Sequence, residues 1–266
     1  MIKLIALDLD GTLLDPEGTI TQESRKAIAK ARRAGVRVVL NTGRSIPEAS
    51  AFAREAGCDE LLSCLGGAAL VNGAREEVLH RWDLPEPSGE RALELCLNRK
   101  IELMIFLGET ILMDPFSQKS LLHTFDSPVF HRRAIVTEDP LAYKRERRLP
   151  LTKLHGDGKP GAYPLTELAA LPGVELTSSN DHDFELVAGG VDKGRALTML
   201  AQMYGVSLND CAAVGDSDND LAMLQVVGTP IAMGNAAPSV KQAARWVSAS
   251  HGEEGVAQAI LHCLER

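Results

Sequence analysis

Cysteine is scarce in this sequence, and no two cysteines form a C-x-x-C pair. The five cysteines are an odd number at scattered positions, namely Cys58, Cys64, Cys96, Cys211 and Cys263. A disulfide framework needs an even number of cysteines, and a structural zinc site needs closely spaced pairs. The pattern argues against both and indicates buried thiols in a reducing compartment.

Basic residues and long uncharged stretches are also few. Lysine and arginine number 28 against 36 aspartates and glutamates, which gives a formal net charge of −8. Such an acidic chain disfavours nucleic acid and anionic membrane surfaces as partners. The longest uncharged stretch, residues 221–240, contains two prolines and two glycines and is a poor membrane span. No basic and apolar leader pattern opens the chain, so we expect a cytoplasmic protein.

Short apolar runs alternate with helical patterns at both ends of the sequence. Strands are predicted at residues 36–40 and 61–65, and Thr21 and Ser45 are predicted to cap the helices that precede these strands. The alternation is repeated late in the chain, with a predicted helix at 197–204, a strand at 211–214 and further strand-like runs. Alternation of this kind predicts an α/β fold with a parallel sheet covered on both faces.

The middle of the chain has a different pattern. Adjacent strand-like runs at 103–107 and 110–113 predict one hairpin, and runs at 174–178 and 184–187 predict another around Asn180, Asp181 and His182. Paired strands with intervening helices indicate an α+β module. We therefore predict an α/β core made of residues 1–80 and 189–266, with an α+β domain inserted at residues 81–188.

Two carboxylates follow the first predicted strand, in the stretch IALDLDGTLLD at residues 5–15. In an extended segment residues i and i+2 share a face, so Asp8 and Asp10 are expected to point at one spot. Two carboxylates about 4 Å apart repel by about 4 kcal/mol at an effective dielectric constant near 20. The pair therefore predicts a cation or a reaction that uses it.

More polar residues follow other predicted strands. Thr42 and Gly43 come after the second strand, and the late strand runs into GDSDND, residues 215–220. Ligands of open parallel sheets bind outside the carboxyl ends of the strands, so these residues are candidates for one acidic site. A hard divalent cation with oxygen ligands is the natural compensation.

Two other motif interpretations fail. GDSDND resembles a calcium-binding loop, but that loop needs Gly and Glu where this chain has Leu221 and Val227. The glycines at 189 and 194 have the spacing of a P-loop, but the required Lys-Ser/Thr is replaced by Arg195 and Ala196.

The ordered set of motifs resembles the haloacid dehalogenase superfamily. The set consists of DLDGT near the N-terminus, Thr-Gly after the second strand, a lysine at the start of a late helix, and GDxxND. More narrowly, the chain is similar to the Cof-type (subfamily IIB) phosphatases, along its whole length. The resemblance implies a Rossmann-like core and makes the inserted module a C2B-type cap.

The resemblance also implies roles for individual residues. Asp8 is the expected nucleophile that forms an aspartyl phosphate, and Asp10 is expected to protonate the leaving oxygen and later activate water. Mg²⁺ is the implied cofactor, with Asp8, the backbone carbonyl of Asp10, and Asp216 as ligands. Asp220 is expected to orient Lys193 or a metal-bound water. The implied phosphate-binding residues are Leu9, Thr42, Gly43, Lys193 and Asn219.

Two positions depart from the branch pattern. Asn41 replaces the usual alanine before Thr-Gly-Arg, and Gly66-Gly67-Ala68 replaces the usual Asn-Gly-Ala after the third strand. The missing asparagine affects one polar contact near the hinge to the cap and leaves the phosphoryl chemistry intact.

The sequence thus predicts a magnesium-dependent phosphatase that hydrolyses a small phosphorylated metabolite, with sugar phosphates as the first candidates. A phosphomutase or phosphotransferase would use the same residues and stays an alternative. A non-enzymatic metal- or anion-binding protein would be expected to have lost Asp8 or Asp10, and both are present. No motif in residues 81–188 specifies the substrate, and none in the chain specifies an oligomeric state.

Overall fold

The structure is a computed structural model that describes residues 1–125, 127–157, 163–178 and 183–265. The chain forms two compact units. One unit consists of Met1–His80 together with Asp192–Arg266, and the other consists of Arg81–Val191. Residues 180–182, which were predicted to form the turn of a hairpin, lie outside the described residues.

The first unit is built on a parallel sheet with strand order β14-β13-β12-β1-β2. The strands are short, and every residue of β1, β12 and β13 is buried, as expected for the centre of a sheet covered on both faces. Their bounds are β1 Leu4–Leu7, β2 Arg37–Leu40, β12 Cys211–Gly215, β13 Thr229–Ala232 and β14 Trp246–Val247. The predicted α/β core with a parallel sheet is confirmed.

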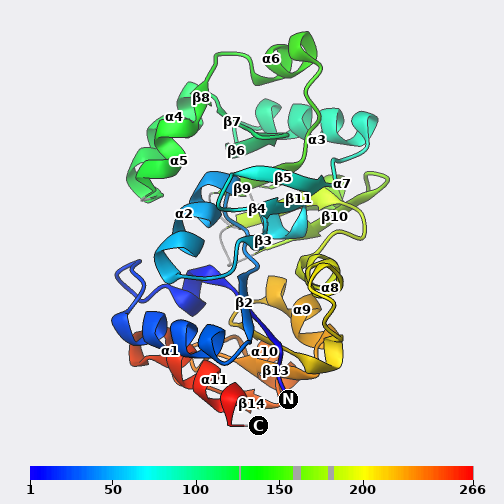
Figure 1. Cartoon of the computed structure of the whole chain (residues 1–266). Coiled ribbons are helices and arrows are strands. Elements are labelled where there is room, and N and C mark those ends of the chain that lie inside the picture. Colours follow the sequence, from blue (N-terminus) through cyan, green and yellow to red (C-terminus); the bar gives the residue numbers. More distant parts are fainter. Residues whose placement is uncertain (126, 158–162, 179–182, 266) are drawn as a thin grey trace. The chain divides into compact units, whose positions relative to one another are not determined.

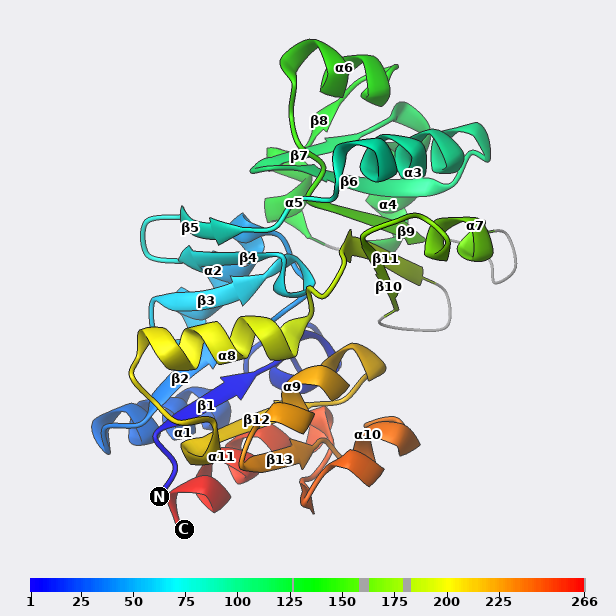
Figure 2. The same ribbon diagram turned by 90° about the vertical axis from the view of Figure 1, so that its right-hand side faces the viewer.

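Helices cover both faces of this sheet (Figures 1 and 2). α1 packs against α11 and α2 on one face, and α8, α9 and α10 pack in a row on the other. Their bounds are α1 Gln22–Arg33, α2 Ile46–Ala56, α8 Lys193–Met203, α9 Leu221–Val226, α10 Pro238–Ala243 and α11 Gly255–Leu264. Both predicted caps form: the Thr21 side chain accepts from the backbone N–H of Ser24, and Ser45 forms a capping box with Glu48.

The third strand is present but pairs differently from the prediction. β3 (Leu61–Cys64) touches β2 through a single parallel bridge between Asn41 and Ser63. It otherwise pairs antiparallel with β4 (Ala69–Asn72), and β5 (Glu77–Arg81) completes this small sheet. The reason is the turn after β3, where Gly66 and Gly67 adopt left-handed backbone conformations that reverse the chain.

The second unit is an α+β structure. Its sheet has the strand order β10-β11-β9-β6-β7-β8, and all pairs except β7 with β8 are antiparallel. The strand bounds are β6 Glu102–Leu107, β7 Thr110–Met113, β8 Ile135–Val136, β9 Lys153–Asp157, β10 Val174–Thr177 and β11 Asp183–Ala188. The helix bounds are α3 Glu86–Asn98, α4 Pro115–Thr124, α5 Pro128–Arg133, α6 Pro140–Arg147 and α7 Leu165–Ala169.

The two faces of this second sheet differ in polarity. One face contributes leucines and Phe184 to an apolar core with α3 and α7. On the other face, the buried Lys153 Nζ lies 2.6 Å from Glu185 Oε1, and His155 Nδ1 lies 3.6 Å from the same oxygen. Burial alone would raise the pKa of Glu185, but the charges of Lys153 and His155 outweigh it and hold that pKa well below its usual range.

Two expectations about the chain as a whole can be compared with the structure. All five cysteines are free thiols in buried positions. In the described part of the chain, no helix combines the length and the apolar character that crossing a membrane requires.

Candidate active site

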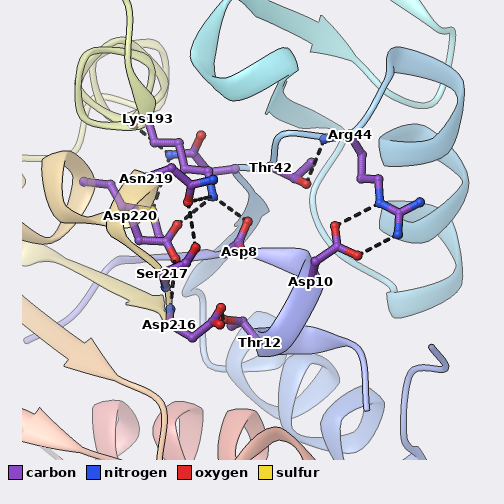
Figure 3. Close-up of polar contacts among 12 residues, drawn as sticks. Asp8, Asp10, Thr12, Thr42, Arg44, Lys193, Asp216, Ser217, Asn219 and Asp220 are labelled. Carbon is purple, nitrogen blue, oxygen red and sulfur yellow. Dashed lines mark hydrogen bonds and ion pairs between the residues drawn. The ribbon is translucent and has the colours of Figure 1, made fainter. Parts of the chain in front are cut away.

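The carboxyl ends of β1 and β12 bring together residues that lie far apart in the sequence (Figure 3). Asp8 follows β1, and Lys193 is the first residue of α8. Lys193 Nζ donates hydrogen bonds to Asp8 Oδ1 at 2.7 Å, to Asp220 Oδ1 at 2.6 Å and to Asn219 Oδ1 at 3.0 Å. A lysine that is only 2% exposed thus joins the start of the chain to the GDSDND loop.

Three carboxylates surround this lysine. Asp8, Asp216 and Asp220 each offer an oxygen, and these oxygens all lie within 4.8 Å of one another. Burial and the charge of Asp220 raise the pKa of Asp8 well above its ordinary value, although Lys193 acts in the opposite direction. Burial and Asp220 also raise the pKa of Asp216 to about 6. Lys193 alone therefore does not balance the negative charge of the cluster.

Asp220 has a different environment from the other two acids. Its Oδ1 accepts from Lys193, and its Oδ2 accepts from the backbone N–H groups of Asp216 at 2.8 Å and Ser217 at 3.2 Å. Both oxygens are therefore engaged by the protein. Asp220 therefore holds the loop and the lysine ammonium in place.

The turn after β1 is fixed by contacts with the C-terminal part of the chain. Gly11 adopts a left-handed conformation with φ +70°, and a Cβ there would lie 2.4 Å from Asp216 Oδ2. The Thr12 hydroxyl donates to Asp216 Oδ1 at 2.8 Å. The Gly11 carbonyl accepts from Asn235 Nδ2 at 2.8 Å, and His251 Nδ1 lies 3.0 Å from the same oxygen. Because a Cβ at position 11 would collide with the Asp216 carboxylate, only glycine fits there.

The Asp10 carboxylate points in a different direction from that of Asp8, so the expectation that the two acids point at one spot was wrong. The strand ends at Leu7, and Asp10 lies in the following turn, so the alternation of side chains no longer applies. Figure 3 shows the Asp10 carboxylate directed at Arg44, whereas Asp8 is directed at Lys193. The Arg44 guanidinium donates to both Asp10 oxygens, from Nη2 at 2.6 Å and from Nε at 2.9 Å.

The remaining predicted residues follow the first two strands. Thr42 follows β2 and is 1% exposed, and its Oγ1 accepts from the backbone N–H of Arg44 at 3.2 Å. Gly43 is partly buried. The Leu9 side chain is completely buried, so only its backbone can face a ligand.

Three residues near the cluster were not predicted as site residues. Thr12 and Arg44 belong to the motifs DLDGT and Thr-Gly-Arg, so their position in those motifs was the available signal. Asn41 was noted only as a departure from the branch. Its Nδ2 donates to the backbone carbonyl of Lys193 at 2.8 Å, which ties the start of α8 to the end of β2.

Comparisons with known proteins identify the family of the chain. A family model described as haloacid dehalogenase-like hydrolase matches residues 5–260. The chain is 31% identical to the 5-amino-6-(5-phospho-D-ribitylamino)uracil phosphatase YwtE of Bacillus subtilis, covering 96% of each protein. It is 28% identical to the pyridoxal phosphate phosphatase YbhA of Escherichia coli, covering 97% of each.

A solved structure shows the same fold. The crystal structure of a haloacid dehalogenase-like hydrolase from Bacteroides thetaiotaomicron superimposes with a TM-score of 0.81 at 28% identity. The match covers 98% of this chain and 99% of that one. With its motifs, fold and relatives in agreement, the chain belongs to the haloacid dehalogenase-like hydrolases.

Proposed function

We propose that the protein is a magnesium-dependent phosphatase that hydrolyses a small phosphorylated metabolite through an aspartyl phosphate on Asp8. The observation that carries this proposal is the buried contact between Asp8 and Lys193 inside a cluster of three carboxylates. A carboxylate held beside a cation is a suitable nucleophile for phosphorus. The phosphatase names of the relatives support the reaction class.

The residues present fit a divalent cation. The oxygens of the three acids lie close enough to share one ion, and the raised pKa values of Asp8 and Asp216 indicate that their charge is incompletely compensated. Asp8 and Asp216 would bind Mg²⁺ through their side chains and Asp10 through its backbone carbonyl. Mg²⁺, when bound, would neutralise charge on the phosphoryl oxygens. Asp220 is left out because the protein already engages both its oxygens.

In the first half-reaction, Asp8 attacks phosphorus and the bond from phosphorus to the leaving oxygen breaks. Asp10 supplies the proton that this oxygen needs. Lys193 stabilises the charge on the transferring group, and its three hydrogen bonds hold the ammonium in place before substrate binds. The groups proposed to hold the phosphoryl oxygens are the Thr42 hydroxyl, the Asn219 amide and the backbone N–H groups of Leu9 and Gly43.

In the second half-reaction, water attacks the phosphorus of the aspartyl phosphate. A new oxygen–phosphorus bond forms, the bond to Asp8 breaks, and the water proton passes to Asp10. Inorganic phosphate leaves, and Asp8 is a carboxylate again. Two displacements at one nucleophile allow the same group to cleave an inert ester and to be regenerated.

We also propose that the inserted domain, predicted at residues 81–188, is a cap that selects the substrate. The compact unit Arg81–Val191 contains none of the motif residues. The relatives act on chemically different phosphates according to their names, one an aminouracil and one pyridoxal phosphate.

The reduced thiols are consistent with the proposed cytoplasmic location.

Phosphate release from p-nitrophenyl phosphate and a panel of phosphorylated metabolites tests the proposal. Turnover should require Mg²⁺, stop with EDTA and be lost in Asp8→Asn. Asp218→Asn is the matched control, because Asp218 is an exposed acid of the same loop that accepts from Ser239. Turnover by the Asp8→Asn variant would contradict the covalent mechanism. Release of an isomerised phosphorylated product instead of phosphate would identify a phosphomutase.

A further inference from the structure

Arg44 binds the second acid of the DLDGT motif in a side-on, bidentate ion pair. Nε and Nη2 each donate to a different Asp10 oxygen, at 2.9 and 2.6 Å (Figure 3). The planar guanidinium matches the planar carboxylate, so the pair defines the orientation of the carboxylate as well as its position. The Asp10 side chain is 52% exposed and would otherwise exchange between rotamers in contact with water.

Arg44 is itself held by the start of α2. Its Nη1 donates to Glu48 Oε1 at 2.8 Å, and the side chain of Glu48 is only 2% exposed. Glu48 also accepts from Ser45 in the capping box that begins the helix. The Arg44 side chain is 18% exposed. The start of α2 therefore fixes Glu48, Glu48 fixes Arg44, and Arg44 in turn fixes the Asp10 carboxylate.

We propose that Arg44 is a positioning residue that holds Asp10 for its acid/base role. This inference rests on the proposed phosphatase function. Both Asp10 oxygens accept hydrogen bonds from the same guanidinium, which is in turn held by the buried Glu48. The pair therefore sets where the carboxylate can meet the proton of the attacking water while a water–phosphorus bond replaces the bond to Asp8.

The two half-reactions need proton transfer at different oxygens. In the second the attacking water must lose a proton, and in the first the leaving oxygen of an alkyl phosphate requires one. An aryl leaving group such as nitrophenolate scarcely needs that proton. Hydrolysis of p-nitrophenyl phosphate therefore separates the two half-reactions, because only the second then depends strongly on Asp10.

Arg44→Met tests the proposal with rapid-quench kinetics on p-nitrophenyl phosphate. We expect dephosphorylation to slow by about 10–100-fold, the scale of a misplaced catalytic group. Nitrophenol should then appear as a burst of one equivalent per enzyme, with a burst rate within about twofold of the wild-type first step. The aspartyl phosphate should accumulate on Asp8. Arg44→Lys keeps the charge next to Glu48 but cannot form the bidentate pair with Asp10, so it should show a weaker burst. If Arg44→Met does not fold, Arg44→Lys is used in its place.

A double-mutant cycle separates positioning from other roles. If Arg44 acts only through Asp10, Arg44→Met should add no more than about twofold to the loss already caused by Asp10→Asn. If Arg44 instead binds the phosphoryl group, the two losses should multiply and KM should rise for every leaving group. Multiplying losses, or a slowed turnover without accumulated phosphoenzyme, would overturn the proposal.

Arg54→Met is the matched structural control. Arg54 lies in the last turn of the same helix, donates to the carbonyl of Gly73 at 2.7 Å and pairs with Glu76 at 3.6 Å. Its loss should lower the melting temperature without producing a burst. A burst in this variant as well would assign the Arg44 effect to helix stability and refute the inference. An inactive wild-type enzyme on all phosphates would refute the proposed function instead.

Discussion

Replacement of Lys193 by methionine should separate the structural from the chemical consequences of the charge cluster. Methionine has a similar length and no charge, so it removes the ammonium and leaves most of the volume filled. The lysine lies between buried acids, with Nζ 2.7 Å from Asp8 and 2.6 Å from Asp220. Removing one partner of a buried ion pair leaves an uncompensated charge, which costs about 3–5 kcal/mol.

This loss of stability converts to a measurable shift. One kcal/mol corresponds to roughly 2–4 °C in melting temperature for a protein of this size class, so Lys193→Met should melt roughly 6–20 °C lower than wild type without metal. Mg²⁺ should restore part of the difference, because a cluster without its lysine attracts a divalent cation more strongly. A ligand at about 100 times its Kd contributes about 2.7 kcal/mol.

Thermal unfolding with EDTA and with saturating Mg²⁺ provides the assay, alongside turnover of p-nitrophenyl phosphate. We expect Mg²⁺ to raise the melting temperature of the variant more than that of wild type, while activity stays low because the ammonium no longer contacts the transferring group. The control is Arg195→Met, an exposed cation two positions along α8, which should change stability by less than about 0.5 kcal/mol. A variant as stable as wild type in EDTA would refute this reasoning.

Three further substitutions test other parts of the structure. Gly11→Ala would place a methyl group 2.4 Å from a carboxylate oxygen of the cluster, so Mg²⁺ affinity in calorimetry should fall by about 10-fold or more. Glu185→Gln removes the carboxylate charge that lies 2.6 Å from the buried Lys153 ammonium and should cost about 3–5 kcal/mol in urea denaturation. Because the pKa of Glu185 is depressed below 4.5, the difference from wild type should be complete at neutral pH and shrink as pH falls below about 4.5. Asn41→Ala removes the hydrogen bond to the Lys193 carbonyl and should cost about 1 kcal/mol and lower kcat; unchanged kinetics would limit Asn41 to a packing role.

The parts of the fold that the sequence predicted correctly depend on local signals. Thr21 and Ser45 cap their helices as expected because a cap is decided within one turn of chain. The pairing of the third strand is also decided locally, because β4 follows β3 after residues 65–68. Its antiparallel pairing with β4 follows from the left-handed glycines 66 and 67, which the sequence analysis treated only as a departure from a family pattern.

The site, in contrast to these elements, depends on both local and distant parts of the chain. The rule that ligands bind at the carboxyl ends of parallel strands correctly placed Asp8 near the GDSDND loop, because sheet geometry fixes where strands end. The direction of Asp10 could not be obtained from that rule. It depends on a turn with its own backbone geometry and on Arg44, which lies 34 positions along the chain. To predict where a side chain points after the end of a strand, one must know the backbone geometry of the turn and the residue that the side chain contacts, in addition to the alternation along the strand.

The separation of the two acids by this turn has a chemical consequence. Asp8 is 4% exposed and lies next to an ammonium and two carboxylates, where water is largely excluded and a nucleophile needs no desolvation before it attacks. The side chain of Asp10, two residues later, is 52% exposed. A nucleophile must be ionised when it attacks, which Lys193 and the proposed Mg²⁺ favour for Asp8 against the effect of burial, whereas an acid/base group must gain and lose a proton in each cycle. If both side chains had lain on the same face of the strand, their mutual repulsion would have made the charge of each acid depend on the charge of the other. The left-handed Gly11 and the Arg44 ion pair keep the acids in different environments, so each can meet its own requirement.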